Sequence, residues 1–167
     1  MISLDISAQG IESIIAELEP TEKQVNAALS RTLNKMAKWI QTRTVKGLSA
    51  ELQVMQKVLR RRMRKTTILK TSTGWTINLW YGLNEISLIH LNARETKRGV
   101  TAGKHKRDGA FIAKGQVFKR QGKGRLPLEK QTLEIKEKAD SYLEAFSNGY
   151  QEQFFKVLEH ELKWQMR

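Results

Sequence analysis

Lysine and arginine are the residue types whose spacing in this sequence supports a definite chemistry, and that chemistry is the binding of anions. The segment from Arg94 to Pro127 holds eleven Lys or Arg and two acidic residues, a net charge of +9. The segment from Lys57 to Lys70 holds seven Lys or Arg and no acid. Charge concentrated in this way indicates a surface for an acidic protein or for nucleic acid. A solvated basic face that only maintains solubility is the alternative.

Thirteen basic residues of these two segments are the candidates for contact with a partner or with DNA. They are Arg60, Arg61, Arg62, Arg64, Lys65, Arg98, Lys104, Lys106, Arg107, Lys119, Arg120, Lys123 and Arg125. The first five crowd the end of an expected helix, where one cation is favourable by about 0.3–1 kcal/mol through the helix dipole. Five cations exceed what that end needs, and their mutual repulsion predicts an anionic neighbour.

No pattern in the sequence supports catalysis, a metal site or a cofactor. The GxSxG, GxxxxGK[ST], HExxH and DxDG patterns are all missing. His160–Glu161 is an isolated pair that we expect to face solvent. The sequence has no cysteine, and its three histidines are too far apart for a metal-ligand motif. We therefore expect a protein that is not an enzyme and that uses no cofactor.

Length and composition predict one α+β domain over residues 1–167. A chain of 167 residues is most simply a single domain. It contains no run of about 18 apolar residues, so we expect no membrane span. The N-terminal residues lack the pattern of a signal peptide, so we expect the chain in the cytoplasm where it is made, or in a particle assembled there.

The first third of the chain is predicted to form a strand followed by helices. Apolar and polar residues alternate over Ile2–Ser7, which predicts a half-buried strand. Helical spacing over Ile11–Leu18 predicts a short helix, and Thr21–Gln24 fits a capping box. A helix of about 25 residues follows and is expected to end at Gly47. A second helix is expected over Leu48–Arg64.

The middle of the chain is predicted to form a small, mostly antiparallel sheet with a long basic loop. Thr66–Leu69 and Trp75–Tyr81 are β-rich runs separated by a hairpin signal. Phe111–Ile112 and Val117–Phe118 predict two short strands anchored to a core. The dense glycine and charge of residues 94–109 predict a flexible basic arm.

A long helix is predicted from about Lys136. Apolar residues recur at every fourth position from Tyr142 to Leu162, a period that drifts around a helix with 3.6 residues per turn. Asn148–Gly149 is a natural place for a break. We expect the first half to pack on the domain and the distal aromatic residues to reach a neighbour. The subunit-interface candidates are Trp39, Trp80, Tyr150, Phe154 and Trp164.

Two stretches of the sequence carry a resemblance to a known family. The first comprises Ala27–Arg31 and Val58–Thr67; the second comprises Gly109–Ile112, Val117–Arg120 and Arg125–Leu128. They resemble the minor tail protein Z family of lambda-like phages and prophages, and more distantly the tail-completion proteins of other long-tailed phages. The order of elements is similar as well: two helices, a small sheet, a basic loop and a C-terminal helix, over roughly residues 25–165.

The resemblance implies a structural tail-completion protein that assembles at the head-proximal end of the tail, at the head–tail junction. Its place would be the virion tail, reached from the host cytoplasm during assembly. Its partners would be further copies of itself in a ring, expected to be hexameric, and tail tube, tail terminator or neck proteins. The basic arm would become ordered against a neighbouring ring. Alternatively, the arm would point towards DNA and contact phosphates without sequence specificity.

A stand-alone basic nucleic-acid-binding protein is the competing interpretation. The charge balance fits it equally well, but the sequence has no RRM, KH or zinc signature. Salt dependence separates the two interpretations. A nucleic-acid binder loses affinity by about 0.9 log unit per log unit of salt for each phosphate contact.

Overall fold

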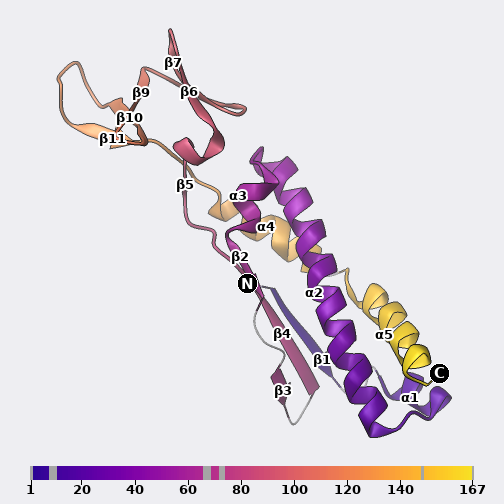
Figure 1. Cartoon of the computed structure of the whole chain (residues 1–167). Helices are drawn as coiled ribbons and strands as arrows, with labels where there is room; N and C mark the ends of the chain where they lie inside the picture. Colours follow the sequence, from indigo (N-terminus) through magenta and orange to yellow (C-terminus); the bar gives the residue numbers. More distant parts are fainter. Residues whose placement is uncertain (1, 8–10, 66–68, 72–73, 148, 167) are drawn as a thin grey trace. The chain divides into compact units, whose positions relative to one another are not determined.

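The chain forms helices and several small antiparallel sheets, which confirms the α+β class. The computed structural model describes residues 2–7, 11–65, 69–71, 74–147 and 149–166 (Figure 1). The chain divides into two compact units. Unit 1 comprises Met1–Thr44, Met63–Tyr81 and Leu143–Arg167, and unit 2 comprises Val45–Arg62 and Gly82–Tyr142.

A four-stranded antiparallel sheet belongs to unit 1. Its central strand is β4 (Gly74–Tyr81), which pairs with β1 (Ile2–Ser7), β2 (Met63–Lys65) and β3 (Leu69–Thr71). These pairings confirm the first strand and the pairing of the two β-rich runs. Residues 66–68 and 72–73, where part of the first run and the turn were expected, lie outside the described residues.

The first two helices begin where the sequence predicts. Helix α1 covers Glu12–Leu18 and α2 covers Glu22–Leu52. The backbone N–H of Thr21 donates to Gln24 Oε1 at 2.8 Å, and the N–H of Gln24 donates to Thr21 Oγ1 at 3.4 Å. These two bonds satisfy N–H groups that a helix start otherwise leaves unpaired, so the capping box is confirmed.

Helix α2 does not end at Gly47 but continues to Leu52, so that expected boundary is wrong. A Cβ built on Gly47 would lie 1.7 Å from Tyr142 Oη, which shows that the glycine is needed for close packing and not for a helix stop. The helix ends before Gln53, which has a left-handed φ of 53°. The expected helix over Leu48–Arg64 is therefore divided between the end of α2, the short α3 (Gln56–Arg60) and strand β2.

The C-terminal helix is broken in two, as the Asn148–Gly149 signal indicates. Helix α4 covers Lys136–Ser147 and α5 covers Gln151–Gln165. The first half packs as expected, with Ala139 and Leu143 buried, but the expectation for the distal half is wrong, because that half of the apolar stripe enters the core of unit 1. Its buried residues are Phe154, Leu158 and Leu162, and those of α2 in this unit include Leu33, Met36 and Ile40.

Besides the end of α2, helix α3 and the start of α4, unit 2 consists of short strands around one turn of 3-10 helix, η2 (Leu88–Leu91). One three-stranded sheet contains β6 (Ala93–Thr96), β7 (Gly99–Ala102) and β8 (His105–Asp108). A second contains β9 (Ala110–Ala113), β10 (Gln116–Arg120) and β11 (Leu128–Lys130). Strands β5 (Ile86–Ser87) and β12 (Thr132–Leu133) form a two-stranded ladder.

The hairpin of β9 and β10 confirms the two strands predicted around Phe111 and Val117. Its turn is Lys114–Gly115, with φ values of 48° and 69°, as a type I′ turn requires. Val117 is fully buried, whereas Phe111 and Phe118 are half-buried and face each other across the strands at 6.4 Å between ring centroids. Val117 is therefore the main anchor of this hairpin.

Residues 94–109, for which the sequence predicts a flexible arm, form most of the β6–β7–β8 meander. All three strands are paired, and Val100 and Ala102 of the central strand are buried. Gly99 has a φ of +150°, and a Cβ there would lie 2.2 Å from the Arg107 carbonyl oxygen. Gly99 thus permits close packing of the strands. The predicted flexibility of residues 94–109 stays a prediction.

Candidate functional site

Positive charge is divided very unequally between the two units. Unit 2 contains 19 Lys or Arg and 8 acidic residues, a net charge of +11. Unit 1 contains 11 Lys or Arg and 9 acidic residues, a net charge of +2. Most of the first basic segment and all of the second fall in unit 2, although they are far apart in the sequence. The candidate site is therefore the basic surface of unit 2.

The turns between the strands of unit 2 display much of this charge. The β6–β7 turn, the β7–β8 turn, the β9–β10 turn and the β10–β11 loop each carry at least one exposed cation. Side chains in turns remain hydrated, so these charges stay exposed to solvent and carry no desolvation cost. The exposed cations of these turns are Lys97, Arg98, Lys104, Lys114, Lys123 and Arg125.

Among the residues that the structure describes, no carboxylate forms an ion pair with this surface. The ion pairs found among the described residues join Lys35 to Glu161, Lys156 to Glu152 and Lys163 to Glu159. All three belong to unit 1. Within the described part of unit 2, no Lys or Arg lies within 4.0 Å of a carboxylate oxygen. The positive charge is therefore left for solvent ions or for another molecule.

Glu95, one of the two acids in the second basic segment, has a structural use instead. Its Oε1 accepts a hydrogen bond of 2.6 Å from the backbone N–H of Ile112. This bond joins strand β6 to the edge of strand β9, and the N–H of Gly109 donates to the Arg98 carbonyl at 2.8 Å beside it. The two small sheets are thereby tied together, which fixes the basic turns on one body.

Arg62 is placed differently from the sequence expectation of a partner-facing base. Its guanidinium donates to the carbonyls of Asn84 at 2.5 Å and Glu85 at 3.1 Å, and its own carbonyl accepts from Gly82 at 2.8 Å. These bonds hold the chain after α3 against the segment that leads into β5. Arg62 is half-buried and is a structural clamp.

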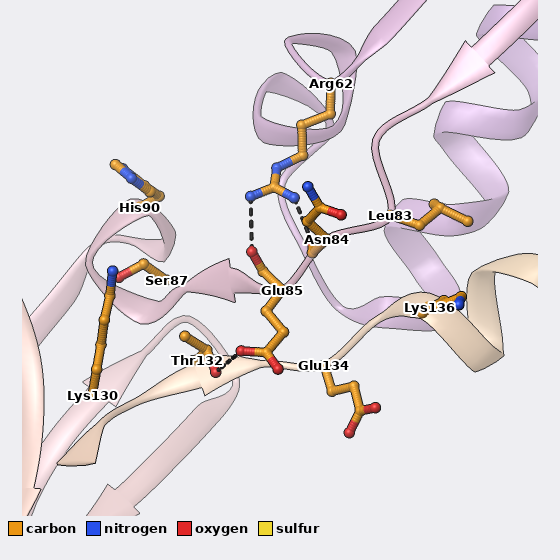
Figure 2. Close-up of a pocket in the computed structure, with 10 residues that line it drawn as sticks. All are labelled: Arg62, Leu83, Asn84, Glu85, Ser87, His90, Lys130, Thr132, Glu134 and Lys136. Atoms are coloured by element: carbon orange, nitrogen blue, oxygen red, sulfur yellow. Dashed lines mark hydrogen bonds between the residues drawn. The ribbon is translucent and has the colours of Figure 1, made fainter.

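A cavity of about 680 Å³ lies beside this clamp (Figure 2). Figure 2 shows the Glu85 carboxylate turned towards Thr132, whose Oγ1 donates to Glu85 Oε2 at 2.7 Å. Arg62 and Glu85 both contribute to bonds that connect neighbouring segments of unit 2. The cavity wall is thus organised by structural bonds, and we assign it no catalytic role.

The remaining bases of the first segment lie on two different elements. Arg60 ends α3, Arg61 follows it, and both are exposed. The Arg60 guanidinium donates to Gln56 Oε1 at 3.3 Å. Arg64 and Lys65 were expected on a helix but belong to strand β2 of unit 1, because the chain turns into the sheet at Met63.

The bases of the second segment are exposed, with one exception. Arg98, Lys104, Lys106, Lys119, Arg120, Lys123 and Arg125 are exposed, and Arg107 is half-buried. The Arg107 guanidinium donates to the Lys106 carbonyl at 3.0 Å. The Arg120 guanidinium lies 5.9 Å from the ring centroid of Phe111, at cation–π range. The structure brings most of these candidates together on the two small sheets of unit 2.

Four of the five interface candidates keep accessible surface. Trp80 and Trp164 are 46% and 51% exposed, and Trp39 and Tyr150 are half-buried. Arg31 stacks over the Trp164 ring at 4.4 Å. Phe154 is the exception, because it is 3% exposed and packs in the core of its own unit. Its ring has no surface left for a neighbouring subunit.

Ion pairs on the solvent face of α5 shift two pKa values. The hydrogen bond and charge of Lys156 lower the pKa of the Glu152 carboxyl. The hydrogen bond and charge of Glu159, with a smaller contribution from Glu17, raise the pKa of Lys163. Both pairs are spaced i, i+4 and exposed to solvent, so they support the helix only weakly.

The described part of the chain offers neither a metal-binding cluster nor a membrane span. Among those residues, no three His, Cys, Asp or Glu side chains gather in a way that would hold a metal ion. None of the described helices is sufficiently long and apolar to cross a bilayer.

Leu126 and Leu128 are surface residues whose exposure sequence reasoning missed. They are 73% and 38% exposed on the β10–β11 loop and strand β11. The available signal was their position: two leucines flank a proline directly after a Gly- and Lys-rich loop.

One comparison with known proteins finds a match. The family model described as prophage minor tail protein Z (GPZ) matches residues 8–167, nearly the whole chain. It confirms the resemblance seen in the sequence, and it favours a structural role over catalysis. No curated protein and no solved structure matches the chain.

Proposed function

Because the chain belongs to the prophage minor tail protein Z family, and is thus a phage tail protein of the virion, we propose that it completes the tail at its head-proximal end. There, at the head–tail junction, several copies form a ring around the path of the DNA. The family supports the tail as the location. The charge distribution supports a partner with negative charge, either an acidic protein or DNA.

The observation that carries this proposal is the unneutralised charge of unit 2. Its net charge of +11 has no carboxylate partner among the described residues of the chain. Like charges repel over about 8–10 Å at ordinary salt concentrations. Copies packed side by side in a ring would therefore need acidic groups close to each unit 2. A neighbouring tail tube, tail terminator or neck protein, or DNA, supplies them.

DNA phosphates are a suitable target for the turns of unit 2. The exposed cations sit on short turns and loops, which suit contact with a phosphate backbone better than reading of base edges. Contacts of this kind have no sequence preference and let DNA slide. Both properties suit a conduit.

A paired substitution tests the proposal in particles. Lys104→Gln with Lys106→Gln removes two exposed charges from β8 and the turn before it. Lys38→Gln with Lys156→Gln removes two from the helices of unit 1 and is the matched control. Each variant complements a phage that lacks the gene, and electron microscopy counts complete, DNA-filled particles. We expect the first pair to lower that count and the control to leave it unchanged.

Gold labelling of purified particles then tests the position in the tail. The label is expected at the head-proximal end. Label elsewhere on the tail, or equal counts for the two variant pairs, would contradict the proposal. Steeply salt-dependent binding of duplex DNA by a free protein that is missing from tails would instead support the stand-alone nucleic-acid binder.

A further inference from the structure

Two surfaces of the protein combine exposed apolar side chains with opposite charge. Six large hydrophobic side chains are exposed among the described residues, and four of them fall in two places. Leu126 and Leu128 belong to unit 2, and Trp164 and Met166 belong to unit 1. Exposed apolar groups that gather beside charges indicate contact with another protein.

The first surface is the basic finger, defined as residues Lys119–Lys130. It comprises the end of β10, the loop and β11, and every residue in it is exposed. Its base is fixed by the β10–β11 pairing and by a 3.3 Å bond from the N–H of Gln121 to the Pro127 carbonyl. The finger carries five cations and one acid, Glu129. It is thus a positioned projection with a basic surface and two leucines.

The second surface is the acidic end of unit 1, where α1, the start of α2 and the last turn of α5 meet (Figure 1). Gln24 Nε2 donates to the Gln165 carbonyl at 3.1 Å and joins α2 to α5. The exposed acids here are Glu17, Glu19 and Glu22. None of the three forms a salt bridge with a described residue. Trp164 and Met166 are exposed at the end of α5, where Arg31 stacks over the Trp164 ring at 4.4 Å and Lys163 is also exposed.

We propose that the basic finger of one copy docks on the acidic end of the next copy. The inference rests on the proposed ring and identifies its contact. The segment Glu17–Glu22 holds three exposed acids and no base, so its charge is opposite to that of the finger, and each surface offers leucine or larger apolar groups to the other. Because the surfaces belong to different units, the contact is heterologous, the type that repeats from copy to copy and closes a ring. Duplex DNA would neutralise the finger but would leave Leu126 without an apolar partner.

Charge reversal tests the contact. The finger variant is Lys123→Glu with Arg125→Glu, and the end variant is Glu19→Lys with Glu22→Lys. Analytical ultracentrifugation over a range of protein concentrations measures self-association at about 0.1 M salt. We expect the wild-type chain to form oligomers and each variant alone to remain monomeric. A chain with all four substitutions has the wild-type net charge, and we expect it to associate again.

Matched variants separate docking from general charge effects and from misfolding. Lys104→Glu with Lys106→Glu changes the net charge as the finger variant does and should keep association intact. Leu126→Ala keeps the charge and should weaken association about tenfold, as the loss of one buried leucine side chain predicts. Circular dichroism confirms that each variant is folded.

Several results would overturn the docking. They are a wild-type chain that stays monomeric, variants that associate as the wild type does, or a fourfold variant that stays monomeric. Loss of duplex DNA binding by the finger variant with association unchanged would assign the finger to DNA. A label at the head-proximal end of the tail together with any of these results would reject the docking and leave the proposed function standing.

Discussion

Glu161 shows how a single residue is fixed by its partner. Its side chain is buried on α5, so the expectation that it faces solvent is wrong, whereas His160 is exposed as expected. The charge of Glu161 is met by Lys35 of α2, whose side chain is 58% exposed. Leaving a buried charged acceptor without a partner costs about 1–3 kcal/mol or more. Lys35→Met should therefore lower the free energy of unfolding by about that amount, measured by urea denaturation.

Lys163→Met is the matched control for this change. Lys163 pairs with Glu159 on the same helix, and both side chains are exposed. Exposed pairs contribute about 0–1 kcal/mol. Equal losses of stability in the two variants would show that burial of Glu161 has no special effect.

Glu152 offers a second test at the residue scale. The hydrogen bond and charge of Lys156 lower its pKa, so the pair helps stability above the ordinary carboxyl pKa of about 4.3 and stops helping as pH falls through the lowered value. Lys156→Met should return the Glu152 pKa towards the ordinary value in an NMR titration. A Glu152 pKa that is the same in both proteins would contradict the assigned cause.

Local residue roles were predictable from the sequence and distant ones were not. Thr21 and Gln24 are three positions apart, so their capping bonds follow from the helix pattern alone. Arg62 bonds to carbonyls 22 and 23 positions further along the chain. Hydrophobic periodicity carries no information about such a distant pairing. The basic residues of Arg60–Lys65 therefore looked equivalent in the sequence, although Arg62 is a structural clamp.

At the scale of elements, the contact of Gly47 with Tyr142 decides how α2 and α4 pack within unit 2. Glycine in a helix interior is less favourable than alanine by about 0.5–1 kcal/mol. A Cβ at position 47 would lie 2.2 Å from Tyr142 Cζ, so Gly47→Ala should destabilise the wild-type chain despite its better helix propensity. In a Tyr142→Ala background the same change should stabilise by about 0.5–1 kcal/mol.

Thermal or urea unfolding of the four proteins of this cycle measures the coupling between the two positions. The account predicts a change of sign between the backgrounds. An equal effect of Gly47→Ala in both would show that the close approach has no energetic consequence.

Element types were predicted better than element ends. The strand at Ile2–Ser7, the β9–β10 hairpin and the two-part C-terminal helix follow from alternation, turn residues and period. The end of α2 depends on the left-handed φ of Gln53, a residue type with no preference for that conformation. The burial of Phe154 depends on contacts made across the unit.

For the whole molecule, the charge blocks were visible in the sequence but their assembly on one unit was not. Each unit combines segments that lie far apart along the chain. The sum of +13 therefore gave no indication that unit 2 holds +11 of it. The family and the α+β class were predictable because they depend on the order of elements, which the sequence records directly.

Lysine labelling in protein diluted until it is monomeric and in assembled tails tests the central claim most directly. The claim is that unit 2 meets an acidic surface only after assembly. Mass spectrometry measures how far an amine-reactive reagent modifies each lysine in the two states. We predict that Lys104, Lys106 and Lys123 lose reactivity in tails while Lys38 of α2 keeps it. Unchanged reactivity of all four lysines in purified tails would contradict the account.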